Sequence, residues 1–322
     1  MSKRKVIVTR KWPDEVESRL VENYDVQLNE QDKPLSHEDL KAAICSSDAV
    51  LPTVTDSINA DILNVDPLRA KFLGNFGAGF DHIDLSVARA RGITVTNTPE
   101  VLTDCTADIA LTLMLMACRR AGEGERHVRN NSWAGWRPTF QLSTKFTGKT
   151  LGLIGMGRIG VAVAERAHFG FGLKIIFSDP KPPPEVITKR LGAKQCALHD
   201  VLKQADIVSV HCPGGSNTYH LIDTDELKQM KPEAVMVNTA RGDVINNVAL
   251  IAALRDGEIA AAGLDVYENE PALNQALLEL ENVVLLPHIG SGSLETRIAM
   301  GNRVLQNLDA FFAGDTPHDK VV

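Results

Sequence analysis

The sequence predicts an α/β protein with two doubly wound parallel sheets, one domain being inserted within the other. Short apolar segments alternate with helical segments in the first hundred residues, and the same alternation restarts near residue 150. A glycine-rich turn joins a strand to a helix in mid-chain, at 151–160, rather than near the start. With 322 residues, the chain has room for about two domains that each bury a core.

Five strands are expected before the glycine turn, and their alternation with helices predicts a parallel sheet covered on both faces. These strands are 6–9, 26–28, 49–51, 72–75 and 93–96. After the turn, six strands are expected near positions 151, 174, 207, 234, 260 and 283. Six strands with intervening helices suit a second doubly wound domain.

Two helices and one polar segment set the expected domain boundaries. Residues 103–120 are apolar over so much of their surface that we expect a helix buried between domains or against another subunit. Residues 121–147 are polar and contain two tryptophans, which predicts an irregular, packed arm that reaches a partner chain. Residues 295–313 form an amphipathic helix stopped by Gly314, and we expect it to return to the first domain.

The glycines of the mid-chain turn have the spacing of a dinucleotide-binding loop. Gly155, Gly157 and Gly160 follow the apolar strand 151–154 in a G-x-G-x-x-G pattern. Such glycines permit a tight turn, a close approach to a pyrophosphate and close packing of helix on strand. The N–H groups at the start of the next helix, where Arg158 and Ile159 lie, point toward the phosphates.

An acidic residue stands at the distance expected for a ribose ligand. Asp179 lies 24 positions after Gly155, close to the usual separation of about 20. A carboxylate there repels a 2′-phosphate, so we expect NAD, with NADH preferred over NADPH. The alternative interpretation is that Asp179 only opens the turn at Pro180. Lys181, close by, keeps NADP open as a cofactor.

Composition narrows the class of protein. The chain has 34 basic and 41 acidic residues and a net charge of −7, which argues against a nucleic-acid partner. Five cysteines without a C-x-x-C pair predict free thiols and no metal site. The longest apolar stretch, 109–118, is too short to span a bilayer. No leader pattern opens the chain, so we expect a cytoplasmic protein without a membrane partner.

Polar residues follow three strands of the second domain, where the ligand crevice of such a sheet lies. Arg241 offers a rigid fork that can hold a carboxylate and polarise a carbonyl. His288 carries an imidazole, which exchanges protons near neutral pH, and Glu270 can orient it. Singly, each residue has a structural explanation as a turn, helix-start or loop residue. Together, beside a dinucleotide motif, they favour catalysis.

Several motifs together resemble those of the D-isomer-specific 2-hydroxyacid dehydrogenases over essentially the whole chain. Within that family the sequence is most similar to the glyoxylate and hydroxypyruvate reductases. The motifs that carry the resemblance are 155–160 (GMGRIG), 238–243 (NTARGD), 263–271 (GLDVYENEP) and 287–291 (PHIGS), supported by 75–84 (NFGAGFDHID), 97–108 (NTPEVLTDCTAD) and 119–125 (RRAGEGE).

The resemblance implies both an architecture and a reaction. A Rossmann-type NAD domain, 102–289, is inserted in a flavodoxin-like substrate domain, 1–101 with 290–322, and the enzyme is a homodimer with an arm near 121–147. The implied reaction is reduction of a small 2-oxoacid, such as glyoxylate to glycolate or hydroxypyruvate to D-glycerate. Hydride transfer from NADH is accompanied by protonation from His288.

The resemblance also implies roles for individual residues. Arg241 binds the 2-oxoacid, and Glu270 and His288 form the acid/base pair. Substrate contacts are implied for Phe76, Gly77, Ala78, Gly79, Arg241 and His288, of which the first four offer backbone amides to the substrate carboxylate. Cofactor contacts are implied for Gly155, Gly157, Arg158, Ile159, Gly160, Asp179, Pro213, Thr218, Thr239, Ala240, Asp265, Gly290 and Thr106.

Two departures from the family pattern bear on the substrate. Gly214 and Gly215 stand where a bulkier residue commonly follows the proline, which predicts a looser cofactor-lining loop. Phe140 stands in the arm where some glyoxylate reductases place a tryptophan. Other hypotheses are another dehydrogenase of this family, such as phosphoglycerate dehydrogenase, and a dinucleotide-sensing binding protein similar to the corepressors that share the fold.

Overall fold

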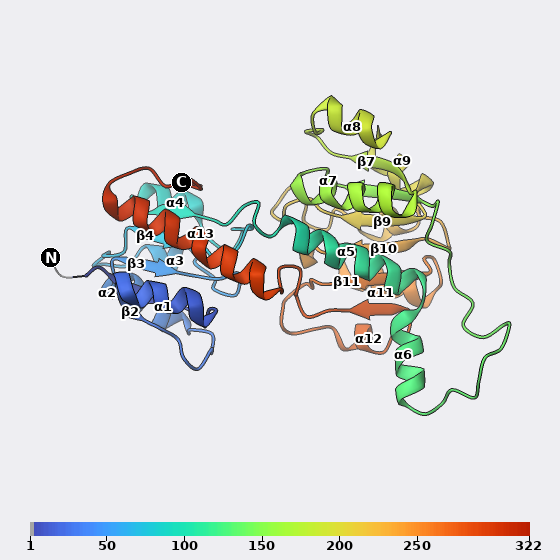
Figure 1. Ribbon diagram of the computed structural model, residues 1–322, viewed down its shortest axis with the longest axis horizontal. Helices are drawn as coiled ribbons and strands as arrows, with labels where there is room; N and C mark the ends of the chain where they lie inside the picture. Colours follow the sequence, from blue (N-terminus) through green and yellow to red (C-terminus); the bar gives the residue numbers. More distant parts are fainter. Residues whose placement is uncertain (1–2) are drawn as a thin grey trace. The chain divides into compact units, whose positions relative to one another are not determined.

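The computed structural model describes residues 3–322, which divide into two compact units (Figure 1). The first unit joins the described part of Met1–Leu102 to Ser291–Val322, and the second is Thr103–Gly290. Each unit contains one parallel sheet with helices on both faces. The α/β, doubly wound fold class expected from the sequence is therefore confirmed.

The first unit contains a five-stranded sheet in the order β2-β1-β3-β4-β5. This is the flavodoxin-like order. The second strand is added on one side of β1, and the strands from β3 onward are added on the other side. All neighbouring strands are parallel. The strands are β1 (Lys5–Val8), β2 (Asp25–Gln27), β3 (Ala49–Leu51), β4 (Phe72–Gly74) and β5 (Thr94–Thr96).

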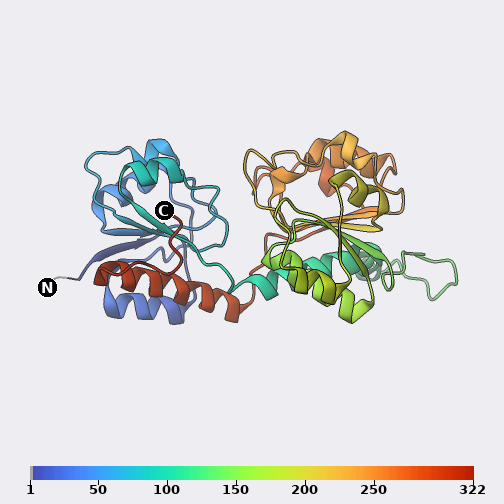
Figure 2. The ribbon, with the colours of Figure 1, turned by 90° about the horizontal axis from the view of Figure 1, so that it is seen from above.

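Two helices cover one face of this sheet and three cover the other (Figure 2). The first pair is α1 (Asp14–Asn23) and α13 (Leu294–Ala313), and the three are α2 (His37–Ser46), α3 (Ala60–Leu63) and α4 (Leu85–Ala90). Side-chain caps at Ser36, Asn59 and Asp84 start α2, α3 and α4. Gly314, with a φ of 90°, ends α13 at the expected position.

Two glycines allow α13 to pack closely within the first unit. A Cβ on Gly301 would lie 2.6 Å from Cγ1 of Val16 in α1, and a Cβ on Gly74 in β4 would lie 2.7 Å from Cγ1 of Val304. Neither distance is compatible with a side chain. The C-terminal helix therefore packs against a helix and a strand that come from the first hundred residues.

The second unit contains a seven-stranded parallel sheet in the order β12-β11-β10-β9-β6-β7-β8. The chain starts in the middle of the sheet at β6, adds β7 and β8 on one side, and adds the strands from β9 onward on the other side. This is the dinucleotide-binding topology with one further strand. The strands are β6 (Thr150–Ile154), β7 (Lys174–Ser178), β8 (Lys194–Gln195), β9 (Ile207–Val210), β10 (Val235–Asn238), β11 (Ala261–Leu264) and β12 (Val283–Leu285). The sequence prediction missed β8 because both of its residues are exposed and polar.

Helices cover both faces of the second sheet, and each face has its own apolar core. On one face, α5 packs against β10, β11 and β12, and α7 packs beside α5. On the other face lie α9, α10 and α11. The helical segments are α5 (Thr103–Cys118), α6 (Ala121–Arg129), α7 (Arg158–Glu165), η1 (Arg166–Gly170), α8 (Glu185–Leu191), α9 (Leu198–Gln204), α10 (Thr224–Leu227), η2 (Gly242–Val244), α11 (Asn247–Arg255) and α12 (Gln275–Leu278).

The segment 121–147 differs from the prediction. Its first part is the helix α6 rather than irregular chain, and an Arg120–Glu123 ion pair holds the start of that helix. The helix buries none of its residues, so the apolar periodicity that predicts helices is missing. Trp133 and Trp136 follow it with 56% and 82% of their surface exposed, so neither is buried within this chain.

Within residues 3–322, no helix has the length and apolar character needed to cross a membrane.

Candidate active site

Each glycine of the turn after β6 meets a different steric requirement. Gly155 has a φ of 95°, and a Cβ there would lie 2.6 Å from the backbone nitrogen of Cys212. A Cβ on Gly160 would overlap the carbonyl oxygen of Gly155, so this glycine lets α7 approach the strand. A Cβ on Gly157 would meet nothing within 4 Å. A side chain is therefore excluded at Gly155 and Gly160, whereas the space beside Gly157 is open.

The start of α7 fits an anionic group. Gly157 is its N-cap residue, and no side chain caps the first turn, which contains Arg158, Ile159 and Gly160. Uncapped amides at a helix start carry partial positive charge and bind phosphates. The open space at Gly157 adjoins this helix start. These residues fit a dinucleotide pyrophosphate.

Asp179, directly after β7, contacts the glycine turn. Its Oδ2 accepts a hydrogen bond of 2.6 Å from the backbone of Met156, and its Oδ1 accepts one of 2.7 Å from the backbone of Lys181. The bond from Lys181 closes the turn at Pro180, as expected if Asp179 is a turn residue. The bond from Met156 keeps the carboxylate at the glycine turn, where the fold brings the ribose of a dinucleotide. The turn contact therefore does not conflict with the ribose contact predicted from the sequence.

The structure brings together several residues expected near the cofactor. The Thr218 hydroxyl donates to the carbonyl of Pro213 at 2.7 Å, which folds the loop after β9. Thr239, after β10, has a buried hydroxyl with no hydrogen-bond partner among the described residues. A Cβ on Gly290 would lie 3.1 Å from Oδ2 of Asp265 and 3.4 Å from Cγ2 of Thr106. The last three residues therefore meet where β11 ends and α5 begins.

The side chains of His288 and Glu270, which the sequence analysis expected to interact, are in contact. Nδ1 of His288 lies 2.7 Å from Oε2 of Glu270, and Oε1 of Glu270 accepts a bond of 2.7 Å from the backbone of Tyr267. About a third of each side chain of the pair is exposed, so both are accessible to a ligand. Because Nδ1 faces the carboxylate, Nε2 of the imidazole is the atom left for a substrate.

Backbone strain accompanies this pair. His288 has a φ of 55°, and Asn269, next to Glu270, has a φ of 62°. Both lie in the left-handed region, which is costly for residues other than glycine. Such conformations cluster at functional sites because the surrounding structure must hold them. Here Asp265 fixes the chain after the histidine, since its carboxylate accepts bonds of 2.7 and 2.6 Å from the amides of Ile289 and Gly290.

Burial and hydrogen bonding shift two carboxyl groups in opposite directions. Burial tends to raise the pKa of Glu270, but the hydrogen bond and charge of His288, the Tyr267 amide and the charge of Arg241 together lower it. Burial raises the pKa of Asp265, although the hydrogen bonds that its carboxylate accepts from two backbone amides oppose the rise. Glu270 is therefore ionised beside the imidazole at neutral pH.

Arg241 follows β10 in a loop that is held by its own side chains. The Asn238 side chain donates to the carbonyl of Arg241 at 2.8 Å and accepts from the amide of Ala240 at 2.9 Å. The guanidinium donates to the carbonyl of Ala240 at 2.8 Å. A Cβ on Gly242 would overlap the backbone of Tyr267, so the loops that carry Arg241 and Glu270 touch through their backbones.

Gly214 makes room for Arg241. A Cβ at position 214 would lie 2.8 Å from Cγ and 3.4 Å from Cβ of the arginine. The stem of the side chain therefore passes over this glycine. From the sequence, Gly214 and Gly215 were expected to make this loop flexible. In the structure, Gly214 is instead needed to make space for the Arg241 side chain.

A second histidine–acid pair, which the sequence prediction missed, lies beside the first. Nε2 of His220 lies 3.0 Å from Oε1 of Glu268, and the amide of His220 donates to the carbonyl of Asp243 at 2.8 Å. These contacts tie the loop after β9 to the loops that carry Arg241 and Glu270. His220 lies outside the motifs of the sequence, and although Glu268 lies within the segment 263–271, only the contact in space reveals the pair.

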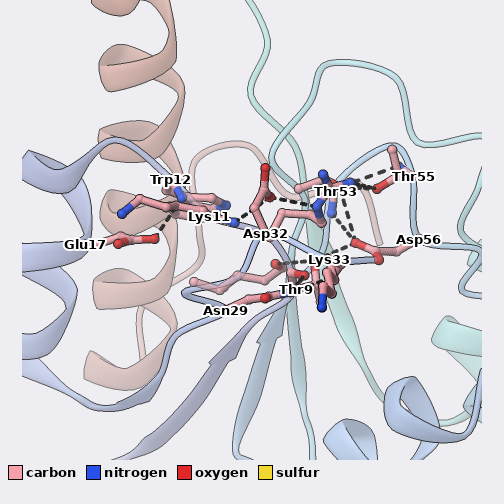
Figure 3. A network of polar contacts seen from close by, with 12 residues as sticks. Thr9, Lys11, Trp12, Glu17, Asn29, Asp32, Lys33, Thr53, Thr55 and Asp56 are labelled. Carbon is pink, nitrogen blue, oxygen red and sulfur yellow. Dashed lines mark hydrogen bonds and ion pairs between the residues drawn. The ribbon is translucent and has the colours of Figure 1, made fainter. Parts of the chain in front are cut away.

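The loop Phe76–Gly79 lies in the first unit, after β4, and is not in the same unit as the other predicted site residues. Phe76 donates its amide to the carbonyl of Pro52 at 2.8 Å, and its ring contacts that of Trp12 in a tilted arrangement with ring centres 4.5 Å apart. Figure 3 shows the polar network that braces the neighbouring loop: Asp56 accepts from the Thr9 hydroxyl at 2.5 Å and from the Thr53 amide at 2.7 Å.

No group of three or more His, Cys, Asp or Glu side chains in the described part of the chain is placed to hold a metal ion.

Comparison with known proteins identifies the family. The model for the NAD-binding domain of the D-isomer-specific 2-hydroxyacid dehydrogenases matches residues 111–290. The chain belongs to this family. Among curated relatives, the glyoxylate reductases of Thermococcus litoralis and Aeropyrum pernix are both 42% identical to it. The alignments cover 99% of this chain and 97% of the first relative, and 100% and 96% for the second.

Solved structures of the same class match along the whole chain. The NADPH-dependent glyoxylate/hydroxypyruvate reductase from Sinorhizobium meliloti, in complex with NADP and malonate, has a TM-score of 0.88 and 34% identity, and covers 100% of this chain and 97% of that one. A glyoxylate reductase from Paecilomyes thermophila has a TM-score of 0.87 and 31% identity, and covers 100% and 99%. This dehydrogenase is thus an NAD(P)-dependent oxidoreductase that acts on CH–OH groups and on small 2-oxoacids.

The space that Gly214 leaves for Arg241 generates a prediction. A Gly214→Ala variant should displace the arginine side chain, because the new methyl group overlaps its stem. We expect the KM for glyoxylate to rise about tenfold, equivalent to about 1.4 kcal/mol, while the Kd for NADH stays within twofold. Steady-state kinetics and NADH fluorescence measure these values.

Ser216→Ala is the matched control, because Ser216 is exposed in the same loop. It should leave both constants unchanged. Equal KM values for the two variants would show that Gly214 does not position Arg241.

Proposed function

We propose that this dehydrogenase reduces glyoxylate to glycolate and hydroxypyruvate to D-glycerate, with His288 as the general acid and base. The observation that carries the proposal is the hydrogen bond of 2.7 Å between His288 and Glu270, beside the charge of Arg241. A dinucleotide bound at the glycine turn supplies the hydride that adds to C2 of the oxoacid.

The proposed roles of the side chains follow from their geometry. Nε2 of His288 gives a proton to the carbonyl oxygen as that oxygen gains negative charge, and the imidazole regains a proton from solvent. The carboxylate of Glu270 holds the imidazole through Nδ1 and stabilises its protonated form. Arg241 binds the carboxylate of the oxoacid and offsets the charge on its reacting oxygen.

The remaining predicted residues are proposed to hold the two ligands. The amides of Phe76, Gly77, Ala78 and Gly79 bind the substrate carboxylate. The cofactor lies on Gly155 to Gly160, Asp179 and Pro213, Thr218, Thr239 and Ala240, with Thr106, Asp265 and Gly290 at the nicotinamide end. The uncapped start of α7 and the unpaired hydroxyl of Thr239 support this arrangement.

The function is tested with a panel of 2-oxoacids and one catalytic variant. Wild-type protein should oxidise NADH with glyoxylate and hydroxypyruvate. His288→Gln should lower kcat by about 10²–10⁴-fold, because the proton donor is lost, while NADH binding is retained. Absence of turnover with the whole panel would favour a dinucleotide-sensing binding protein, and a variant with nearly normal turnover would reject the acid role.

A preference for NADH over NADPH is proposed from Asp179. Its carboxylate, fixed by the Met156 amide, repels a 2′-phosphate at the same place. Wild-type kcat/KM should be at least tenfold higher with NADH than with NADPH, and Asp179→Ser should narrow that ratio mainly by improving NADPH. A wild-type preference for NADPH would contradict this role.

A homodimer through the arm near 121–147 is also proposed. Trp133, Trp136 and Leu142 expose 56%, 82% and 67% of their surface, an arrangement typical of protein interfaces. A hollow of about 560 Å³ lies where the arm returns to the second sheet, lined by Cys118, Arg120, Leu142, Thr144 and Val283 among others. The proposed occupant of this surface is a second copy of the chain.

A cytoplasmic location is proposed from the five free thiols.

Sedimentation equilibrium tests the dimer. The wild-type protein should sediment with the mass of two chains, and the double variant Trp133→Ser, Trp136→Ser should sediment mainly as one chain because the exposed indoles no longer bury apolar surface. Val248→Ser, which changes a residue 69% exposed on α11, is the control and should remain dimeric. A wild-type monomer would reject the proposal.

A further inference from the structure

Two asparagine side chains capture three successive carbonyl groups of the loop after β4. The side-chain nitrogen of Asn75 donates to the carbonyl of Gly77 at 3.0 Å and to that of Gly79 at 2.8 Å. The side-chain nitrogen of Asn97, which follows β5, donates to the intervening carbonyl of Ala78 at 2.7 Å. The amide of Thr98 also donates to the carbonyl of Gly77, at 3.0 Å.

Capture of these carbonyls fixes the direction of the amides. In a trans peptide unit the N–H points away from the C=O, so the N–H of Ala78 points away from Asn75, which holds the carbonyl of Gly77, and the N–H of Gly79 points away from Asn97, which holds the carbonyl of Ala78. Within residues 3–322, neither of these two N–H groups has a hydrogen-bond partner. Backbone N–H groups without a partner in the chain are available to bind an anion.

Asn75 is itself fixed by a third contact. Its Oδ1 lies 3.0 Å from Nε2 of His82, and its side chain is fully buried. Because both hydrogens of the Asn75 amide are used on carbonyls, its oxygen must accept, so Nε2 of His82 carries the proton in this contact. A carboxylate in place of the amide would turn an oxygen toward two carbonyl oxygens and could hold neither.

The positive charge near the loop comes from α13. The guanidinium of Arg297 lies 6.0 Å from the centre of the Phe76 ring. The loop thus combines directed N–H groups with a nearby cation, which suits a carboxylate.

We propose that Asn75 and Asn97 are positioning residues for the substrate carboxylate, and that they act by holding the carbonyls of Gly77, Ala78 and Gly79 so that the amides face the ligand. This inference rests on the proposed role of Phe76–Gly79 in the reaction. Neither asparagine touches the substrate; their effect passes through the backbone of the loop.

The test uses Asn75→Asp and Asn97→Ala in the full chain, with Asn64→Asp as the control. Asn64 is an exposed residue of the same unit whose side chain has no hydrogen bond to another described residue. In both test variants the KM for glyoxylate should rise at least tenfold, while kcat and the Kd for NADH stay within threefold. A general loss of structure would instead lower kcat and NADH binding together.

Calorimetric titration of oxalate into the NADH-saturated protein measures carboxylate binding without turnover. Its Kd should rise in the test variants by about the same factor as the KM and stay unchanged in Asn64→Asp. Oxalate Kd values within twofold of wild type in a folded Asn97→Ala would overturn the inference, even where Asn75→Asp fails to fold. Lack of glyoxylate turnover by the wild type would overturn the proposed function instead, and the oxalate titration would still decide the role of the asparagines.

Discussion

The backbone contact at Gly242 is the constraint on which the arrangement of Arg241 and Glu270 depends. A Cβ at this position would overlap the backbone of Tyr267, so only glycine lets the loop after β10 reach the loop after β11. The first loop carries Arg241, and the second carries Glu270. Because the two backbones touch, the charge of the arginine acts on Glu270 and helps to lower its pKa. Glu270 then stays ionised beside His288, which is what an imidazole acid/base requires.

In both units the amides proposed to bind anions belong to the backbone, but they are held by different means. In the second unit these amides belong to the start of α7, where an uncapped first turn and a glycine without nearby atoms leave space that fits a phosphate. In the first unit the amides belong to the loop after β4, where asparagine side chains hold the carbonyls. The first arrangement leaves a glycine motif in the sequence, whereas the second depends on a contact between Asn97 and Ala78, 19 residues earlier in the chain.

This difference explains how much of the protein the sequence could predict. The parallel sheets, the glycine turn and the contact of Glu270 with His288 were all predictable, because apolar alternation and strand ends mark them directly. The edge strand β8 was missed because Lys194 and Gln195 are exposed, and α6 was missed because it buries nothing. His220 and Glu268 were missed because their pairing joins two loops that are far apart in the chain. The need for Gly214 appears only when the path of Arg241 is known.

Glu270 holds the imidazole of His288 in place through a hydrogen bond of 2.7 Å, and the kinetics of Glu270→Gln test this pairing most directly. Replacing the carboxylate by a neutral amide removes the negative charge beside the imidazole and keeps the size of the side chain. The kcat for glyoxylate reduction should therefore fall at least tenfold, while the Kd for NADH stays within threefold. A kcat within twofold of the wild type would contradict a role for Glu270 in positioning His288.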